Sequence, residues 1–117
     1  MPKETTISIP LADLAEGRMV TRSAGGREIM VCRTKDGLFA VDNICSHAYA
    51  RLNEGRLRGF RVICPLHGAA FDVRTGAVLG APANRAIGSF PVHSDGTHAT
   101  VTVPDAPDVP HIAPPMP

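Results

Sequence analysis

The sequence predicts a small antiparallel all-β protein, and three observations support this class. Short runs of apolar and β-branched residues recur along the chain and are separated by turn residues. Eleven glycines and eleven prolines divide the 117 residues into pieces that are too short for long helices. Apolar residues make up 44% of the chain but aromatic residues only 4%, so the core must consist mainly of aliphatic side chains. A chain of this length forms one domain with a modest core, which excludes a large catalytic domain.

The expected elements follow one another from the amino terminus to residue 103, as about ten short strands. One or two helical turns are expected over residues 10–17, where Gly17 ends the helix. The dipeptide Asp36-Gly37 lies between two strand-like runs and predicts a hairpin, and residues 74–77 and 93–98 supply further turns. The expected strands cover residues 6–10, 18–22, 27–34, 37–41, 60–64, 69–73, 77–79, 87–92 and 98–103.

The folded domain is expected to cover residues 1–104, with an insertion of metal-binding loops over about residues 42–82. Both Cys/His pairs of the chain fall within that insertion. Six of the eleven prolines lie within residues 104–117. Because proline cannot donate a backbone hydrogen bond to a sheet, residues 105–117 are expected to form an extended or disordered tail.

The charge and the amino-terminal segment exclude several classes of function. Twelve basic and eleven acidic residues give a formal net charge of +1, which provides no general attraction to nucleic acid or to a membrane. The first ten residues contain no apolar signal-peptide core and no twin arginine, and no segment reaches the roughly 18 apolar residues of a membrane span. We therefore expect a cytoplasmic protein. The odd number of cysteines argues against a disulfide framework and favours metal binding.

Two Cys/His pairs form the motif with the clearest chemistry: Cys45-x-His47 and, after sixteen intervening residues, Cys64-x-x-His67. Two thiolates and two imidazoles suit zinc or an iron–sulfur centre. A zinc finger usually groups its cysteines in one close pair and its histidines in another, whereas here each loop contributes one of each. A mixed pair per loop suits a two-iron cluster with both cysteines on one iron and both histidines on the other.

This pattern, with "CPLHG" as its second loop, resembles the Rieske [2Fe–2S] family. More narrowly, it resembles the ferredoxin components of bacterial multicomponent aromatic-ring-hydroxylating dioxygenases. The resemblance runs from "GLFAVDNICSH" through "CPLHGAAFDVRTGAVLGAP" to "SFPVHSDG". It implies a β sandwich with an inserted cluster-binding subdomain of two loops and one [2Fe–2S] cluster per chain. Cys45 and Cys64 would bind the buried iron, while His47 and His67 would bind the iron nearer to solvent.

The resemblance further implies that the protein is an electron carrier and catalyses no reaction by itself. It would pass single electrons from a NAD(P)H-dependent reductase, either flavin-containing or an iron–sulfur flavoprotein, to a terminal oxygenase. Such a carrier would be a monomer that forms transient complexes. Two alternatives stay open: the small Rieske-like subunit of an assimilatory nitrite reductase, which would share the fold, and a structural zinc-binding interaction module.

The positions around the ligands predict a low reduction potential. In respiratory Rieske proteins each loop carries an extra cysteine and the two form a disulfide, but the matching positions here are Ala50 and Leu66. Those proteins also use a serine and a tyrosine to hydrogen-bond the cluster, and Ala69 and Phe71 occupy these positions. Because such hydrogen bonds stabilise the added electron, we expect a potential near the low end of the Rieske range of about −150 to +300 mV.

The other candidate residues have simpler interpretations. Cys32 is expected to be a small buried strand residue. We assign no role to the three remaining histidines, His93, His98 and His111. A run of arginines between the two Cys/His pairs is either an ordinary solvated face or a surface that steers docking to an acidic partner. The run comprises Arg51, Arg56, Arg58 and Arg61, against Glu54 alone.

Overall fold

The computed structural model describes residues 4–46, 50–66, 68–81, 83 and 85–104. Regular structure in these residues consists of eleven strands and two short 3-10 helices, which confirms the predicted all-β class. The elements are β1 (Glu4–Pro10), η1 (Leu11–Asp13), β2 (Met19–Ala24), β3 (Arg27–Thr34), β4 (Gly37–Asp42), η2 (Leu52–Glu54), β5 (Arg56–Arg58), β6 (Arg61–Ile63), β7 (Ala70–Asp72), β8 (Val78–Gly80), β9 (Ser89–Phe90), β10 (Val92–Ser94) and β11 (His98–Pro104).

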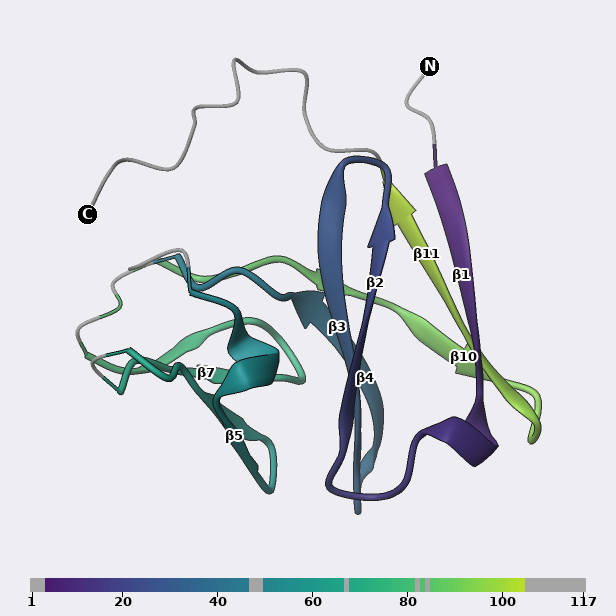
Figure 1. Ribbon diagram of the computed structural model, residues 1–117, viewed down its shortest axis with the longest axis horizontal. Coiled ribbons are helices and arrows are strands. Elements are labelled where there is room, and N and C mark those ends of the chain that lie inside the picture. Colours follow the sequence, from purple (N-terminus) through teal and green to yellow (C-terminus); the bar gives the residue numbers. More distant parts are fainter. Residues whose placement is uncertain (1–3, 47–49, 67, 82, 84, 105–117) are drawn as a thin grey trace.

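The strands form three antiparallel sheets (Figure 1). Two of them, with strand orders β1-β11-β10 and β2-β3-β4-β9, make up a β sandwich. The third sheet, β5-β6-β7-β8, comes between β4 and β9 in the chain and lies to one side of the sandwich. Most neighbouring strands in a sheet are hairpin partners, but β1 with β11 and β4 with β9 join segments that are far apart in the sequence.

The sheet β2-β3-β4-β9 is buried on both faces at its centre. Four consecutive residues of β3, from Ile29 to Cys32, are completely buried. Ile29 and Val31 pack in one core cluster with β1 and β11, whereas Met30 and Cys32 pack in a second cluster with β6 and β7. Because alternate side chains of a strand point to opposite faces, a continuous apolar run is what a doubly covered strand requires.

Cys32 is confirmed as a buried strand residue. Burial raises the pKa of its thiol to about 12. The backbone hydrogen bond with Phe39 lowers this pKa, but by less than burial raises it. The thiol is therefore protonated at neutral pH and behaves as a small apolar side chain.

The turns follow the predicted pattern with one shift of register. The β3–β4 hairpin exists, but Thr34 pairs with Gly37, so the two loop residues are Lys35 and Asp36. The glycine instead begins β4 with a φ of 136°. In the turn at residues 74–77, Gly76 has a φ of 82°, and a Cβ there would lie 2.0 Å from the carbonyl oxygen of Ile87. Only glycine fits this position without moving the backbone.

Three elements differ from the expectations. The helical turns expected over residues 10–17 reduce to η1. The sequence of β5, Arg-Leu-Arg, has one apolar residue and predicts no strand, yet it forms one. The run expected at residues 87–92 divides at Pro91 into β9 and β10, since proline has no N–H to donate to a ladder. Among the described residues, no helix is long and apolar enough to cross a membrane.

Candidate metal centre

The two predicted ligand loops are hairpins that close in the same way. In the first loop, the Cys45 N–H donates to the carbonyl of Ala50 at 2.8 Å. In the second, the Cys64 N–H donates to the carbonyl of Ala69 at 2.7 Å. Both bonds span five residues, so each cysteine occupies the same position at the base of its loop. The second loop continues directly from β6 and returns in β7.

The two cysteines are buried together between these loops. Cys45 is 0% exposed and Cys64 is 2% exposed, and both belong to the core cluster that contains Val62 and Phe71. Burial raises the pKa of the Cys64 thiol to about 11; the Leu66 N–H, 3.4 Å from its sulfur, lowers it, and the neighbouring Cys45 thiol raises it. Two adjacent buried thiols suit a metal, because a bound cation replaces both of their protons.

The histidine half of the predicted ligand set, His47 and His67, lies outside the described residues. The residues on either side of His67 are described. Leu66 is 48% exposed, whereas Cys45 and Cys64 are buried. Gly68 has a φ of 74°, a backbone conformation that favours glycine directly after the predicted ligand. The structure therefore brings Cys45 and Cys64 together, and the assignment of all four ligands stays a prediction.

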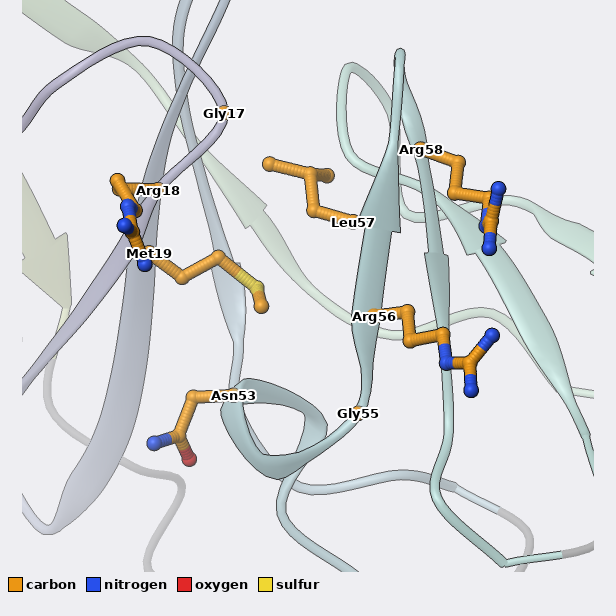
Figure 2. A pocket seen from close by; sticks show the side chains of 8 residues that line it. All are labelled: Gly17, Arg18, Met19, Asn53, Gly55, Arg56, Leu57 and Arg58. Carbon is orange, nitrogen blue, oxygen red and sulfur yellow. The ribbon is translucent and has the colours of Figure 1, made fainter.

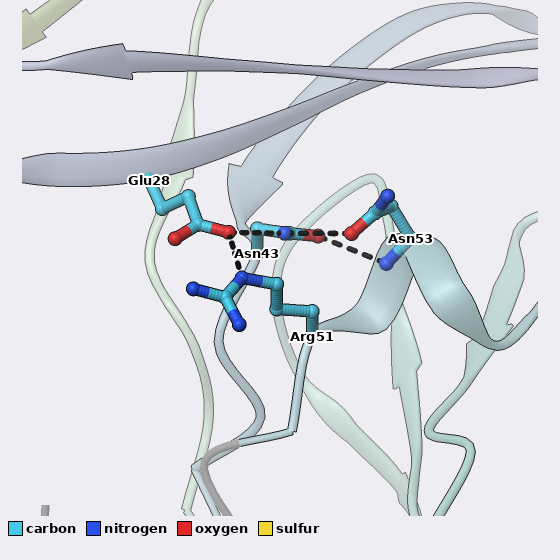
Figure 3. A network of polar contacts seen from close by, with 4 residues as sticks. All are labelled: Glu28, Asn43, Arg51 and Asn53. Carbon is cyan, nitrogen blue, oxygen red and sulfur yellow. Dashed lines mark hydrogen bonds and ion pairs between the residues drawn. The ribbon is translucent and has the colours of Figure 1, made fainter.

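A buried amide, Asn43, organises the first loop (Figure 3). Its side chain is 0% exposed and makes three hydrogen bonds. The Asn43 Nδ2 donates to Glu28 Oε1 and to Asn53 Oδ1, both at 2.9 Å, and Asn43 Oδ1 accepts the backbone N–H of Asn53 at 2.9 Å. The backbone of Asn43 adds bonds to the Glu28 carbonyl and the Leu52 N–H. Asn43 thus joins β3, the first loop and η2, two residues before Cys45.

Arg51 completes this network from the other side of the loop. Its Nε donates to Glu28 Oε1 at 2.8 Å, in the ion pair drawn in Figure 3. Burial works to raise the pKa of Glu28, but the hydrogen bonds from Asn43 and Arg51 and the charge of Arg51 outweigh it, so that pKa lies below 4.5. Glu28 and Asn43 carry no signal in the sequence, because neither belongs to a motif and their pairing depends on tertiary structure.

Two further contacts hold the loops in place. The Ser46 hydroxyl donates to the carbonyl of Arg85 at 2.6 Å, which ties the first loop to the segment that follows β8. Gly55 packs against the strand that leads into the second loop: a Cβ at this position would lie 1.8 Å from the carbonyl oxygen of Ile63 and 3.2 Å from Pro65 Cδ. These contacts also lacked a sequence signal.

A separate cavity of about 500 Å³ lies between the start of β2 and β5 (Figure 2). Met19 and Leu57 point toward each other across it. Of the predicted ligands that the structure describes, neither Cys45 nor Cys64 lines this cavity.

Comparison with known proteins places the chain in a family. Residues 5–91 match the model of the Rieske [2Fe–2S] domain. The ferredoxin component of the naphthalene 1,2-dioxygenase system of Pseudomonas putida is 36% identical over 85 residues, which cover 73% of this chain and 82% of that protein. The ferredoxin of carbazole 1,9a-dioxygenase from Nocardioides aromaticivorans IC177 superposes with a TM-score of 0.78 at 36% identity, covering 83% of this chain and 96% of that one.

A second solved structure contains a complex of reduced oxygenase and oxidized ferredoxin in carbazole 1,9a-dioxygenase. Its matching chain has a TM-score of 0.75 and 29% identity, and the match covers 82% of this chain and 92% of that chain. The matched family region includes both hairpin loops with their buried cysteines. This chain belongs to the Rieske [2Fe–2S] domain family.

Proposed function

We propose that this chain is the ferredoxin component of an aromatic-ring-hydroxylating dioxygenase system. It carries one electron at a time from a NAD(P)H-dependent flavoprotein reductase to a terminal oxygenase. The observation that carries the proposal is the pair of adjacent buried thiols, Cys45 and Cys64, held by two equivalent hairpin loops in a chain of the Rieske family. Its relatives at 36% identity are named as ferredoxin components of dioxygenase systems.

In this proposal Cys45, His47, Cys64 and His67 hold one [2Fe–2S] cluster. When bound, such a cluster accepts and releases a single electron without rearranging covalent bonds on a substrate. The protein keeps the cysteine side dry, because Cys45, Cys64 and the surrounding core residues are buried. The Leu66 N–H donates to the Cys64 sulfur and stabilises negative charge there.

We also propose that the cluster has a low reduction potential. Ala69 and Phe71 are fully buried beside the cysteines and have no hydroxyl to donate to sulfur. Ala50 and Leu66 cannot form a disulfide between the loops. Fewer donors around the sulfurs disfavour the reduced form. A low potential suits delivery of electrons to an oxygenase.

We further propose residues 1–104 as the Rieske domain, with the cluster-binding insertion at about residues 42–82. Residues 105–117 lie outside the described part and are proposed as a proline-rich tail. The carrier acts in the cytoplasm as a monomer and forms transient complexes with its reductase and oxygenase. The oxygenase–ferredoxin complex of the carbazole system supports such a partner.

Low-temperature electron paramagnetic resonance of the dithionite-reduced protein, with iron and zinc counted in the same sample, tests the cofactor. A Rieske-type rhombic signal with about two irons per chain is expected. A silent spectrum with about one zinc per chain would overturn the proposal in favour of a structural zinc module.

Reconstitution then tests the role. Reductase and oxygenase from the organism that supplies this chain should couple NAD(P)H oxidation to hydroxylation of an aromatic substrate only when the chain is present. Coupling to nitrite reduction instead would identify the small subunit of a nitrite reductase, the alternative that shares the fold.

A further inference from the structure

Three arginines lie on one face of the β5–β6 hairpin. Arg58 pairs directly with Arg61, and Arg56 precedes Arg58 by two residues on the same strand. Residues directly opposite each other, or two apart on one strand, share a face of a sheet. Figure 2 agrees: Arg56 and Arg58 point away from Met19, while Leu57 points toward it. All three arginines are exposed, and we call Arg56, Arg58 and Arg61 the arginine face.

No carboxylate among the described residues forms an ion pair with the arginine face. Asp72 lies opposite Arg61 in the β6–β7 register, but it is only 7% exposed. Arg74 already holds both of its oxygens, at 3.0 and 2.9 Å. The ion pairs of the described residues are Arg27–Asp42, Arg51–Glu28 and Arg74–Asp72. Three positive charges thus gather on one surface of a chain whose net charge is +1.

The arrangement acts against the stability of the hairpin itself. Like charges directly opposite each other across an antiparallel pair repel, as Arg58 and Arg61 do. The other face carries the paired apolar residues Leu57 and Val62, which pack with the core. The hairpin is therefore anchored without the arginines, and an anionic partner would relieve their repulsion.

The arginine face is also close, along the chain, to the second ligand loop. Arg61 precedes Cys64 by three residues along β6, and a strand rises by about 3.3 Å per residue, so the separation along the chain is roughly 10 Å. Ile63, which pairs with Arg56 across the two strands, directly precedes Cys64 in the chain. A partner that covers this face therefore lies close to the second ligand loop.

We propose that the arginine face docks an acidic surface of the terminal oxygenase. Guanidinium groups bind carboxylates in pairs of parallel hydrogen bonds, and a concentrated positive face accelerates and orients the encounter. Arg51 does not belong to this face, because it is engaged with Glu28. The inference rests on the proposed function, since it assigns a surface to one of the two electron-transfer partners.

Stopped-flow transfer from the reduced chain to the oxygenase of its own system, across a range of ionic strength, tests the docking surface. The variants are R58E and R56E/R58E, and the matched control is R22E, which reverses one exposed charge on β2. At low salt we expect the double variant to transfer at least tenfold more slowly than the wild-type chain. Its rate should be nearly independent of salt, whereas the wild-type rate falls as salt rises. R22E should stay within about twofold of wild type.

Three measurements separate a docking defect from a damaged protein. The paramagnetic resonance signal and iron content of each variant should match those of the wild-type chain. R58E should melt no lower than wild type, because it replaces a repulsive cross-strand pair with an attractive one.

Three results would overturn the inference. Equal rates and salt dependence in R56E/R58E and wild type would show that the face plays no part in docking. A slower reaction with the reductase and unchanged transfer to the oxygenase would assign the face to the reductase. A wild-type chain that carries its cluster but transfers no electron to the oxygenase would overturn the proposed function as well.

Discussion

Replacing Asn43 with alanine should destabilise the protein by about 3–5 kcal/mol. The substitution removes a hydrogen bond to the Glu28 carboxylate, worth about 1.5–3 kcal/mol, and two bonds with Asn53, worth roughly 0.5–1.5 kcal/mol each. It also leaves the Asn53 N–H without its acceptor. Because small domains are stable by only about 5–15 kcal/mol, this loss is a large fraction of the total.

The assay is urea unfolding of the cluster-loaded protein, followed by far-ultraviolet circular dichroism. With a slope of about 1–1.5 kcal/mol per molar urea, the midpoint should fall by roughly 2–5 M. N53A is the matched control, because it removes only the bond from Asn43 Nδ2 and should cost about 1 kcal/mol. Visible absorbance should also show faster loss of the cluster from N43A, since Asn43 anchors the loop that carries Cys45.

The isosteric variant N43D separates hydrogen bonding from packing volume. It keeps the size of the side chain but places a second carboxylate beside Glu28, 2.9 Å from Oε1 in the native pair. N43D should therefore be at least as unstable as N43A at neutral pH, and it should regain stability as the pH falls and a carboxylate is protonated. If N43A differs from N53A by less than about 1 kcal/mol, the network does not hold the loop as argued.

Three other predictions address the acid response, the loop packing and the potential. The pKa of Glu28 is lower in the folded state than in the unfolded state, so the ionised carboxylate stabilises the fold above about pH 4.5. This stabilisation is lost as the pH falls through the folded-state pKa. E28Q should therefore make the urea midpoint fall less steeply with decreasing pH below about pH 4.5. Gly55→Ala should lower the free energy of unfolding by about 1–3 kcal/mol, because its Cβ would overlap the Ile63 carbonyl; an unchanged urea midpoint would contradict this packing. Phe71→Tyr should raise the reduction potential in a redox titration by roughly 20–65 mV, the equivalent of one hydrogen bond of about 0.5–1.5 kcal/mol; an unchanged or lower potential would show that the hydroxyl does not reach sulfur.

Local patterns predicted much of the fold because strand formation and hairpin turns depend on neighbouring residues. The apolar run of residues 27–34 became the doubly buried strand β3, and Asp36 lies in the loop of the predicted hairpin. The expected strand positions were reliable where alternation was strong. They failed at β5, whose strand conformation arises from pairing with β6 rather than from its own composition.

The candidate site was predictable in its chemistry but not in its support. Cys45 and Cys64 stood out by residue type and spacing, and the structure brings them together. Asn43 and Glu28 are 15 residues apart and carry no motif, so their pairing could not be read from the chain. The arginines between the two Cys/His pairs also differ in their contacts. Arg51 forms an ion pair with a carboxylate 23 residues away, while Arg58 has no such partner among the described residues.

By itself, the sequence determined the all-β class, the pairs of candidate ligands and the family, because each depends on residue types at short spacing. Only the tertiary structure decided which distant segments meet: β1 with β11, β4 with β9, and the two cysteine loops with each other. Strand register then decided which arginines share a face, since a shift of one residue moves every side chain to the opposite side. Pairing and register are set by packing across the whole domain, which no local segment contains.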